Sequence, residues 1–359
     1  MNIDQLDYVL PPNLIATHPA TPRDAARLLV VHCSSGQIEH SKVRDLPNWL
    51  DPADLLVRND SSVLAARLMG QRAVDGSRGG GRVEGLFLCA HEDGDWTVLL
   101  TAGGKLAEGQ LIVLHGPEGE QTTIRLKSKE GRYWRVSFES TESTQDVLSQ
   151  IGRTPLPPYI LKARRSRGEV VEEREDREWY RTIFARADRS GSVAAPTAGL
   201  HFTPEIDARI TELGVRQAFV TLHVGEGTFR PVTSARLEDH KMHFESWCVD
   251  ADEIDALRCG PKHGGRMIAV GTTTTRVLES LPKQLPDGPL SGDTDLLISP
   301  GHAFRRVDGL LTNFHLPRST LLALVAAFTG LDLLHEIYST AIEERYRFYS
   351  YGDAMLVVP

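Results

Sequence analysis

The sequence has few cysteines and no long apolar run, and each shortage disfavours a class of protein. Its four cysteines, Cys33, Cys89, Cys248 and Cys259, are scattered without a Cys-x-x-Cys pair. This disfavours a zinc ribbon, an iron–sulfur cluster or a disulfide framework, and it suits a reducing cytoplasm, where we expect the protein to work. The longest strictly apolar stretch, 321–328, is far shorter than the ~20 residues that cross a bilayer, so it predicts a buried helix.

Two further absences narrow the function. There is no Gly-x-x-x-x-Gly-Lys-Ser/Thr loop and no strand followed by Gly-x-Gly-x-x-Gly, so we expect no dinucleotide site. The first five residues, Met1-Asn2-Ile3-Asp4-Gln5, lack the basic and apolar regions of a secretory signal. The net charge of −8 argues against general coating of nucleic acid, but it does not exclude a local basic patch.

Short strand-like runs at regular spacing begin soon after residue 70. They cover 83–90, 96–101, 111–115, 122–126 and 133–138. Glycine-containing turns separate most of these runs, a pattern typical of a small antiparallel barrel or sandwich, which we place at residues 70–152. The glycine-rich stretch 76–81 predicts a flexible turn.

Strands and helices alternate in the remaining sequence. Strands are expected at 27–32, 55–58, 217–224, 267–270 and 296–299, and helices at 204–213, 252–258, 276–281, 318–329 and 331–347. This alternation favours a largely parallel sheet with helices on its faces. We therefore expect the α/β class, with a large α/β domain formed by both ends of the chain (1–69 and 153–359). The small antiparallel β-barrel domain is inserted between them.

A strongly polarised stretch follows the expected barrel. Basic residues come first and acidic ones directly after: Arg153, Lys162, Arg164, Arg165 and Arg167, then Glu169, Glu172, Glu173, Glu175, Asp176 and Glu178. The composition predicts an exposed loop, which is either a solvated face or a mobile basic arm that touches phosphates. The stiff segment 152–160 is either a hinge or a means of positioning Arg153 and Tyr159 against a ligand.

Five small-residue loops in the second half of the chain carry polar side chains capable of chemistry. They are 194–202, 221–229, 270–276, 312–320 and 348–353. Glycine and proline fix unusual backbone paths, and binding and catalysis concentrate on loops. We expect these loops to form the walls of one site.

Several features of these loops have more than one interpretation. The threonine-rich turn 271–276 is either an anion-binding helix start or a helix whose hydroxyls satisfy its first turn. The histidines are metal ligands, structural hydrogen-bonding groups, or general acids and bases: His201, His223, His240, His243 and His315. Only His240 and His243 are closely spaced, which supports a metal site poorly. Four residues near the C-terminus could each hold the chain's tail in place: Arg347, Tyr349, Tyr351 and Asp353. For Asp353, the alternative is a carboxylate that faces a cationic substrate.

Long motifs extend along nearly the whole chain. They are Asp7-Tyr8-x-Leu10-Pro11, Arg23-Asp24-x-x-Arg27-Leu28-Leu29, Asp54-Leu55-Leu56-Val57-x-Asn59-Asp60, Ala66-Arg67-Leu68-x-Gly70, the stretch 152–160, the five loops, and His240-x-Met242-His243-x-Glu245. Together they resemble the S-adenosylmethionine:tRNA ribosyltransferase-isomerase family of queuosine biosynthesis. The segment 162–178, the glycine run 79–81 and the pair Thr274–Thr275 depart locally from the family pattern.

The resemblance implies a β-barrel inserted into an α/β domain, and it implies a reaction. Enzymes of this family move the ribosyl part of S-adenosylmethionine onto the 7-aminomethyl-7-deazaguanine base at the wobble position of tRNA. The sugar is isomerised to an epoxy-cyclopentanediol, adenine and methionine leave, and epoxyqueuosine remains in the tRNA. S-adenosylmethionine is therefore expected to be a consumed ribosyl donor.

This chemistry needs a base and an acid, because the carbon beside the sulfonium loses a proton and the departing adenine gains one. We assign the base to His201 or His223, and the acid to the other of the two or to His315. The further predicted substrate contacts are Thr197, Gly199, Glu226, Thr228, Thr272, Thr273, Arg276, Asn313, Arg318, Tyr351 and Asp353. Among these, we expect Glu226 and Asp353 to lie near the sulfonium, and Arg276 with the threonine turn to bind the methionine carboxylate. Asn313, Arg318 and Tyr351 are expected to bind the sugar hydroxyls or the deazaguanine.

The anticodon loop of a tRNA offers unpaired bases that can enter a pocket. The predicted tRNA contacts are Arg153, Tyr159, Arg164, Arg165 and Arg167, with Arg305 and Arg306 as further phosphate-binding candidates. We expect no metal, no membrane association and a monomer. The competing hypotheses are a metal-dependent hydrolase that uses the histidines and a non-catalytic RNA-binding protein.

Overall fold

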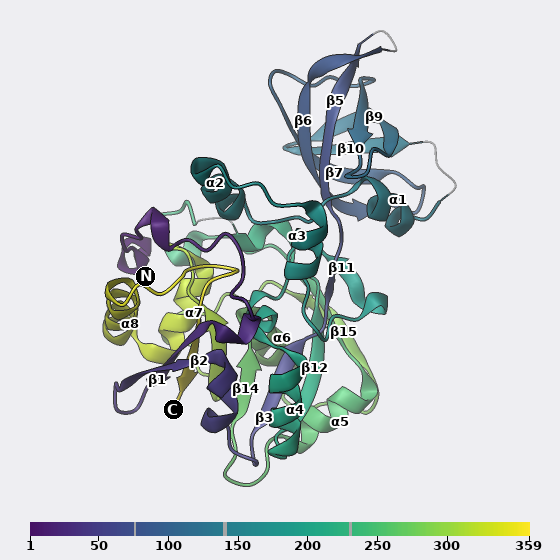
Figure 1. The fold of residues 1–359 in the computed structure, drawn as a ribbon. Helices are drawn as coiled ribbons and strands as arrows, with labels where there is room; N and C mark the ends of the chain where they lie inside the picture. The colour runs from purple at the N-terminus through teal and green to yellow at the C-terminus, as the bar shows by residue number, and fades with distance from the viewer. Residues whose placement is uncertain (75–76, 139–141, 230–231) are drawn as a thin grey trace.

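The computed structural model describes residues 1–74, 77–138, 142–229 and 232–359, without the side chains of residues 74, 77–79, 228 and 229. A large sheet covered by helices forms one part of the molecule, and a barrel forms the other (Figure 1). Both chain termini lie in the part that contains the large sheet (Figure 1).

The large sheet is assembled from both ends of the chain. Its nine strands lie in the order β15-β13-β12-β3-β14-β16-β17-β1-β2. Their bounds are β1 Arg27–His32, β2 Ile38–Lys42, β3 Leu55–Asn59, β12 Arg216–Leu222, β13 Glu245–Val249, β14 Met267–Val270, β15 Leu290–Thr294, β16 Gly309–Asn313 and β17 Ala354–Val358. The central strands β12, β3, β14 and β16 are parallel. Their carboxyl ends therefore meet at one edge, where ligands bind in open α/β sheets.

Helices cover both faces of this sheet because alternate strand residues point to opposite sides. The helices are α4 Pro204–Glu212, α5 Ala251–Cys259, α6 Thr272–Ser280, α7 Thr320–Thr329 and α8 Leu331–Glu343. Leu28 and Val30 of β1 belong to the apolar cluster that contains α4 side chains. Leu29 and Val31 belong to the cluster formed with α5, α6, α7 and α8. The α4 start follows its sequence signal, since the Thr203 side chain accepts a hydrogen bond from the Ile206 N–H.

Six antiparallel strands close into the barrel in the order β10-β7-β6-β5-β8-β9. Their bounds are β5 Arg67–Val74, β6 Ser77–Ala90, β7 Trp96–Ala102, β8 Leu111–His115, β9 Gln121–Glu130 and β10 Tyr133–Phe138. Helix α1 (Thr144–Ile151) shares the barrel's apolar cluster through Val147, Leu148 and Ile151. The predicted α/β class with an inserted antiparallel barrel is confirmed, and the domain boundaries at residues 70 and 152 stay a prediction.

The chain enters and leaves the barrel through one narrow connection. The backbones of Arg67 and Arg153 exchange two hydrogen bonds, of 3.0 and 2.8 Å. A Cβ atom on Gly152 would lie only 1.7 Å from the Ala65 carbonyl oxygen, so the close approach of the two segments requires glycine here. Beside this connection, β4 (Ser62–Val63) pairs with β11 (Ser190–Ser192) as a two-stranded ribbon.

Several local predictions are wrong. The glycine run 79–81 lies within strand β6 instead of forming a turn. The expected strand 296–299 is irregular backbone, and the edge strand of the sheet is β15. The segment expected as an exposed loop forms α2 (Pro158–Arg167) and α3 (Glu173–Trp179). Local signals explain both helices: Pro158 begins α2, Gly168 ends it in the left-handed conformation, and Glu172 with Glu175 forms a capping box at α3.

Candidate active site

Asn59, the last residue of β3, joins two of the predicted loops at the carboxyl edge of the sheet. Its Nδ2 lies 3.1 Å from the Leu222 carbonyl oxygen and 3.4 Å from Thr273 Oγ1, and its Oδ1 accepts from the Leu222 N–H. The side chain is buried, so these bonds stabilise the end of β12 against the start of α6.

The three other loops meet in a buried network of polar side chains. His201 Nε2 lies 3.1 Å from Asn313 Nδ2, and the same amide donates to the Tyr349 carbonyl oxygen. His315 Nε2 lies 2.8 Å from Thr312 Oγ1. Burial lowers the pKa of both histidines to about 3, so both imidazoles are neutral at pH 7. This network orders loops 194–202, 312–320 and 348–353.

A separate cavity of about 420 Å³ lies between the barrel and the carboxyl edge of the sheet. We call it the barrel cleft. Its barrel side includes Leu88, Cys89, Thr97 and Tyr133, and its opposite side includes Gly191, Val193, residues 223–227 and residues 243–246. The volume falls within the usual range for small-molecule sites.

His223 is the predicted catalytic histidine that lines the barrel cleft. It is half-buried, and its Nδ1 has no hydrogen-bond partner among the described residues. Burial, assisted by the positive charge of Arg189, lowers its pKa below the ordinary value. Gly191 packs against the ring so closely that a Cβ atom there would lie 2.7 Å from Nδ1. His223 is thus held as a neutral imidazole beside the cavity.

Glu226 connects the active-site loop to the barrel. Its carboxylate accepts hydrogen bonds from Arg132 Nη2 at 2.7 Å and from the Tyr133 hydroxyl at 2.8 Å. Both partners lie where β9 turns into β10. The barrel therefore helps to position the carboxylate that lines the cleft.

A narrow second pocket adjoins the cleft at the start of α6. It is lined by Gly227, His240, Met242, His243, Glu245, Thr272, Thr273, Arg276, Thr320 and Leu321, and we call it the α6 pocket. Gly227, His243 and Glu245 line both cavities. The α6 pocket measures about 20 Å³, enough for about one water molecule. Its helix start has no side-chain cap, so backbone N–H groups remain available to an anion.

The guanidinium of Arg276 is already committed within the protein. It forms a buried ion pair with Glu245, and it donates to the Leu296 and Thr294 carbonyl oxygens at 3.0 and 3.3 Å. The predicted role of Arg276 as the main carboxylate ligand is therefore disfavoured. The hydroxyls of Thr274 and Thr275 donate to the Val270 and Gly271 carbonyl oxygens, so neither of them caps an N–H group at the start of the helix.

The structure divides the predicted substrate contacts instead of gathering all five loops around one cavity. Glu226 lines the barrel cleft, and Thr272, Thr273 and Arg276 line the α6 pocket. Outside the linings of both cavities lie Thr197, Gly199, Asn313, Arg318, Tyr351, Asp353 and the two histidines His201 and His315. The side chain of Thr228 lies outside the described residues.

Two charged residues in that outlying group have structural partners. Asp353 is buried and accepts from the backbone N–H groups of Arg27 at 2.9 Å and Arg347 at 2.7 Å. Arg318 pairs with Asp4 at 3.0 Å. The interpretation of Asp353 as a tie for the C-terminal tail fits these contacts better than the prediction of a sulfonium contact.

Most predicted tRNA contacts are also engaged within the protein. Arg164 is buried against Asp176 with two 2.8 Å hydrogen bonds and also donates to the Thr17 carbonyl, so the mobile-arm hypothesis is wrong for this residue. Arg167 donates to the carbonyls of Pro12 and Ile15.

Four of the remaining candidates for tRNA contact bond other groups of the protein, and the fifth, Arg165, lies exposed. The Tyr159 hydroxyl bonds Ser350 Oγ at 2.5 Å, and Arg153 reaches the Gly116 carbonyl at 3.4 Å. Arg305 and Arg306 bond carbonyls at the carboxyl end of α6, opposite to the end that lines the pocket. Arg165 is exposed, with one long contact to a carbonyl of its own helix.

The described residues form neither a metal-binding cluster nor a single membrane-spanning helix. Within the described ranges, no group of three or more His, Cys, Asp or Glu side chains is arranged to hold a metal ion. In the same part of the chain no single helix is long and apolar enough to cross a membrane. Only α7 and α8 pass that test together, and a 112° bend separates them.

Sequence reasoning missed three residues that line the cleft, Tyr133, Phe244 and Glu245, and left the role of a fourth, His243, open. His243, Phe244 and Glu245 belong to the motif His240-x-Met242-His243-x-Glu245, whose signal was visible. Phe244 is 72% exposed and is the one strongly exposed aromatic side chain among the described residues. Tyr133 comes from the barrel, and nothing local in its sequence signals this position.

Known proteins resemble the chain over its full length. The profile of the family described as queuosine biosynthesis protein matches residues 3–357. Two proteins named S-adenosylmethionine:tRNA ribosyltransferase-isomerase are similar: that of Thermotoga maritima is 43% identical and covers 100% of both chains. That of Rubrobacter xylanophilus is 45% identical and covers 100% of this chain and 98% of the relative. A crystal structure of an S-adenosylmethionine tRNA ribosyltransferase from Thermotoga maritima has a TM-score of 0.54 and 34% identity, covering 99% of this chain and 100% of that one. The chain belongs to the queuosine biosynthesis protein family.

Proposed function

We propose that this protein is an S-adenosylmethionine:tRNA ribosyltransferase-isomerase. It transfers the ribosyl part of S-adenosylmethionine to the 7-aminomethyl-7-deazaguanine wobble base of tRNA and isomerises it, leaving epoxyqueuosine, adenine and methionine. The observation that carries this conclusion is the full-length similarity, at 41–45% identity, to relatives of that name. These comparisons give no support to a metal-dependent hydrolase or to a non-catalytic RNA-binding protein.

We assign the base to His223. A proton on the carbon beside a sulfonium is acidified, and a neutral imidazole can accept it. The lowered pKa of His223 keeps the ring neutral at pH 7, and the residue lines the cleft. His201 and His315 lie outside the cavity linings, so we give them the role of positioning residues for the loops around the site.

We place the acid that protonates adenine at His243, which lines both cavities. Glu226 lies on the same wall and supplies negative charge for the sulfonium. A negative charge close to a cation lowers its free energy. The reaction centre is then the region near Gly227, where the barrel cleft and the α6 pocket meet.

We expect the methionine carboxylate to bind at the start of α6. Uncapped N–H groups and the positive end of the helix dipole favour an anion there, and the hydroxyls of Thr272 and Thr273 add donors. Because the α6 pocket has room for only about one water molecule, binding at this helix end requires the pocket to widen.

We expect Phe244 to stack against a nucleobase of the tRNA. Unpaired bases in RNA are commonly held by stacking on aromatic side chains, and this ring is exposed at the cleft wall. The variant Phe244→Ala should raise KM for the RNA by roughly 10-fold, in line with about 1–3 kcal/mol per stacked base, while KM for S-adenosylmethionine stays unchanged. A rise confined to S-adenosylmethionine would instead place the adenine of that substrate on Phe244.

The central experiment mixes the protein, S-adenosylmethionine and precursor tRNA and measures released adenine. Single-turnover rates are then compared for wild type, His223→Gln and a control, His263→Gln, whose side chain is exposed. Loss of a general base should slow the chemical step by about 10²–10⁴-fold. Adenine release without RNA modification would contradict the proposed transfer, and an unchanged rate in His223→Gln would contradict the base assignment.

We further propose that the enzyme acts in the cytoplasm as a monomer and without a resident metal. Its cysteine usage supports the compartment. Elemental analysis of the active protein tests the metal prediction, since a stoichiometric metal required for turnover would overturn it. Sedimentation at working concentration tests the monomer, and a stable dimer would overturn that prediction.

A further inference from the structure

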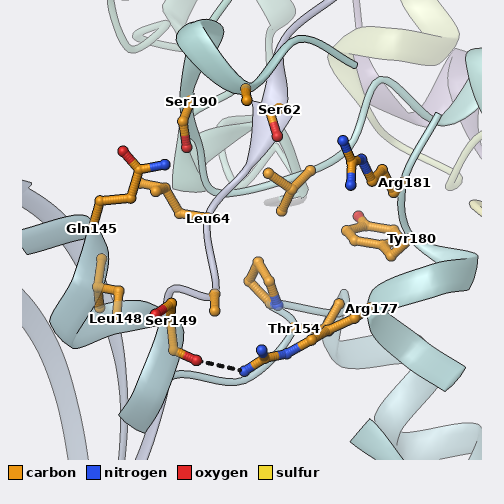
Figure 2. A pocket seen from close by; sticks show the side chains of 14 residues that line it. Ser62, Leu64, Gln145, Leu148, Ser149, Thr154, Arg177, Tyr180, Arg181 and Ser190 are labelled. Carbon is orange, nitrogen blue, oxygen red and sulfur yellow. Dashed lines mark hydrogen bonds between the residues drawn. The ribbon is translucent and has the colours of Figure 1, made fainter. Parts of the chain in front are cut away.

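A second sizeable cavity, of about 290 Å³, lies beside the connection between the sheet and the barrel (Figure 2). Ser190 of β11 lines this second cavity, and the next residue, Gly191, lines the barrel cleft. The two cavities therefore adjoin at β11. We call the second cavity the Arg181 crevice.

The lining of the Arg181 crevice is polar and basic. Its polar side chains are Ser62, Gln145, Ser149, Thr154, Arg177, Tyr180, Arg181 and Ser190, and none of the described lining residues is acidic. Gln145 and Ser149 come from α1, which packs on the barrel, whereas the serines of β4 and β11 belong to the ribbon. A ligand in the crevice therefore contacts both sides of the connection.

The two arginines differ in how far they are engaged. Arg177 donates to the Ser149 and Gly152 carbonyl oxygens at 3.2 and 2.8 Å and pairs with Glu173 at 3.3 Å. The guanidinium of Arg181 has no hydrogen bond or ion pair within the described part of the chain. Figure 2 shows it directed into the cavity, across from Gln145. One uncompensated positive charge thus faces a group of hydroxyl and amide donors.

We propose that the Arg181 crevice binds a backbone phosphate of the RNA substrate, an inference that rests on the proposed function. Arginine and hydroxyl donors are the groups that proteins use to hold phosphate oxygens and to set the register of a nucleic acid. An RNA strand held here lies beside β11, which also contributes to the lining of the reaction cavity. The contact places the anticodon loop so that its wobble base reaches the barrel cleft.

The first test compares Arg181→Gln with Arg174→Gln. Arg174 is exposed on neighbouring α3, outside the crevice lining, and its replacement removes the same net charge. Affinity for an anticodon stem–loop RNA is measured by fluorescence anisotropy between 50 and 200 mM salt. Loss of one single-strand phosphate contact lowers the slope of log affinity against log salt by about 0.7. The affinity difference between wild type and Arg181→Gln should therefore decrease by about 2.6-fold from 50 to 200 mM salt. Equal slopes and affinities in both variants overturn the proposal.

The second test locates the phosphate on the RNA. Stem–loops with one neutral methylphosphonate linkage are bound to wild type and to Arg181→Gln. At one position the neutral linkage should weaken wild type and leave Arg181→Gln unaffected, because each change removes the same contact. Additive losses at every position overturn the proposal. In a parallel experiment, inorganic phosphate is added to the protein–RNA complex at constant ionic strength. If phosphate binds through Arg181 without displacing RNA, the site binds free anions and the RNA assignment is wrong.

These experiments separate the crevice from the reaction. Binding is measured without S-adenosylmethionine, so it does not depend on turnover. If wild type releases no adenine yet Arg181→Gln shows the expected slope, the proposed function fails and the phosphate site stands. If wild type is active and the slopes are equal, the phosphate site fails and the proposed function stands.

Discussion

Lowering the pH from 7 to 5 should destabilise the protein through His201 and His315, which are both buried. Burial lowers the pKa of each to about 3, and for His201 the charges of Arg347 and Arg23 act in the same direction. In the unfolded chain a histidine titrates near pKa 6.5. Below about pH 6.5 the unfolded state therefore takes up protons that the folded state does not bind until about pH 3, so stability falls through this window.

The magnitude follows from the difference in proton uptake. Between pH 7 and 5, each histidine lowers the free energy of unfolding by about 2 kcal/mol, and the pair lowers it by about 4 kcal/mol. The total stability of a folded protein is roughly 5–15 kcal/mol, so the loss is a large share of it.

The assay is denaturant unfolding at pH 7 and pH 5 of wild type, His201→Gln, His315→Gln and the exposed control His263→Gln. Glutamine retains a polar group near the Nε2 position but does not titrate. The drop in the free energy of unfolding between pH 7 and 5 should be smaller by about 2 kcal/mol in each buried variant and unchanged in the control. An equal drop in all four proteins would refute the reasoning, because it would mean that neither imidazole excludes its proton when folded.

Two further predictions concern the site and the basic segment. In Gly227→Ala the new Cβ would lie 2.3 Å from His243 Cδ2, whereas in Gly225→Ala it would meet only an ordinary 3.8 Å contact. Single-turnover adenine release should fall roughly 10²-fold in Gly227→Ala alone, because a 1 Å misplacement has that effect. Equal rates in the two variants would contradict this prediction. Arg164→Met leaves Asp176 buried without its partner, which should lower the free energy of unfolding by about 3–5 kcal/mol. Chemical denaturation measures this loss, and reduced RNA affinity at wild-type stability would restore the basic-arm hypothesis.

Elements with local signals were predictable from the sequence. Strands β1, β8 and β10 match their expected bounds, because turns flank compact runs of apolar residues. The error at glycines 79–81 has a tertiary cause. A Cβ atom on Gly80 would lie 2.3 Å from the Arg72 carbonyl oxygen of β5, so glycine is needed there for strand pairing and does not form a turn.

The basic segment shows why charge patterns alone mislead. Arg164 of α2 and Asp176 of α3 are twelve positions apart, and they meet only in the folded protein, where the same guanidinium also donates to the Thr17 carbonyl oxygen. The sequence shows opposite charges in two blocks, which is equally typical of a solvated loop. Distance in space, rather than composition, decides that this arginine is structural.

The barrel contributes to the site mainly by geometry. Tyr133 and Glu226 are 93 positions apart and meet only because the barrel closes over the sheet edge, so no reading of local sequence could place them together. The Arg132 side chain is 46% exposed, and an exposed ion pair contributes about 0–1 kcal/mol, too little to hold two parts of the molecule together. The pair therefore acts on the direction of the Glu226 carboxylate. Tilting the barrel would break both hydrogen bonds and turn that carboxylate away, so cleft shape and local charge change together.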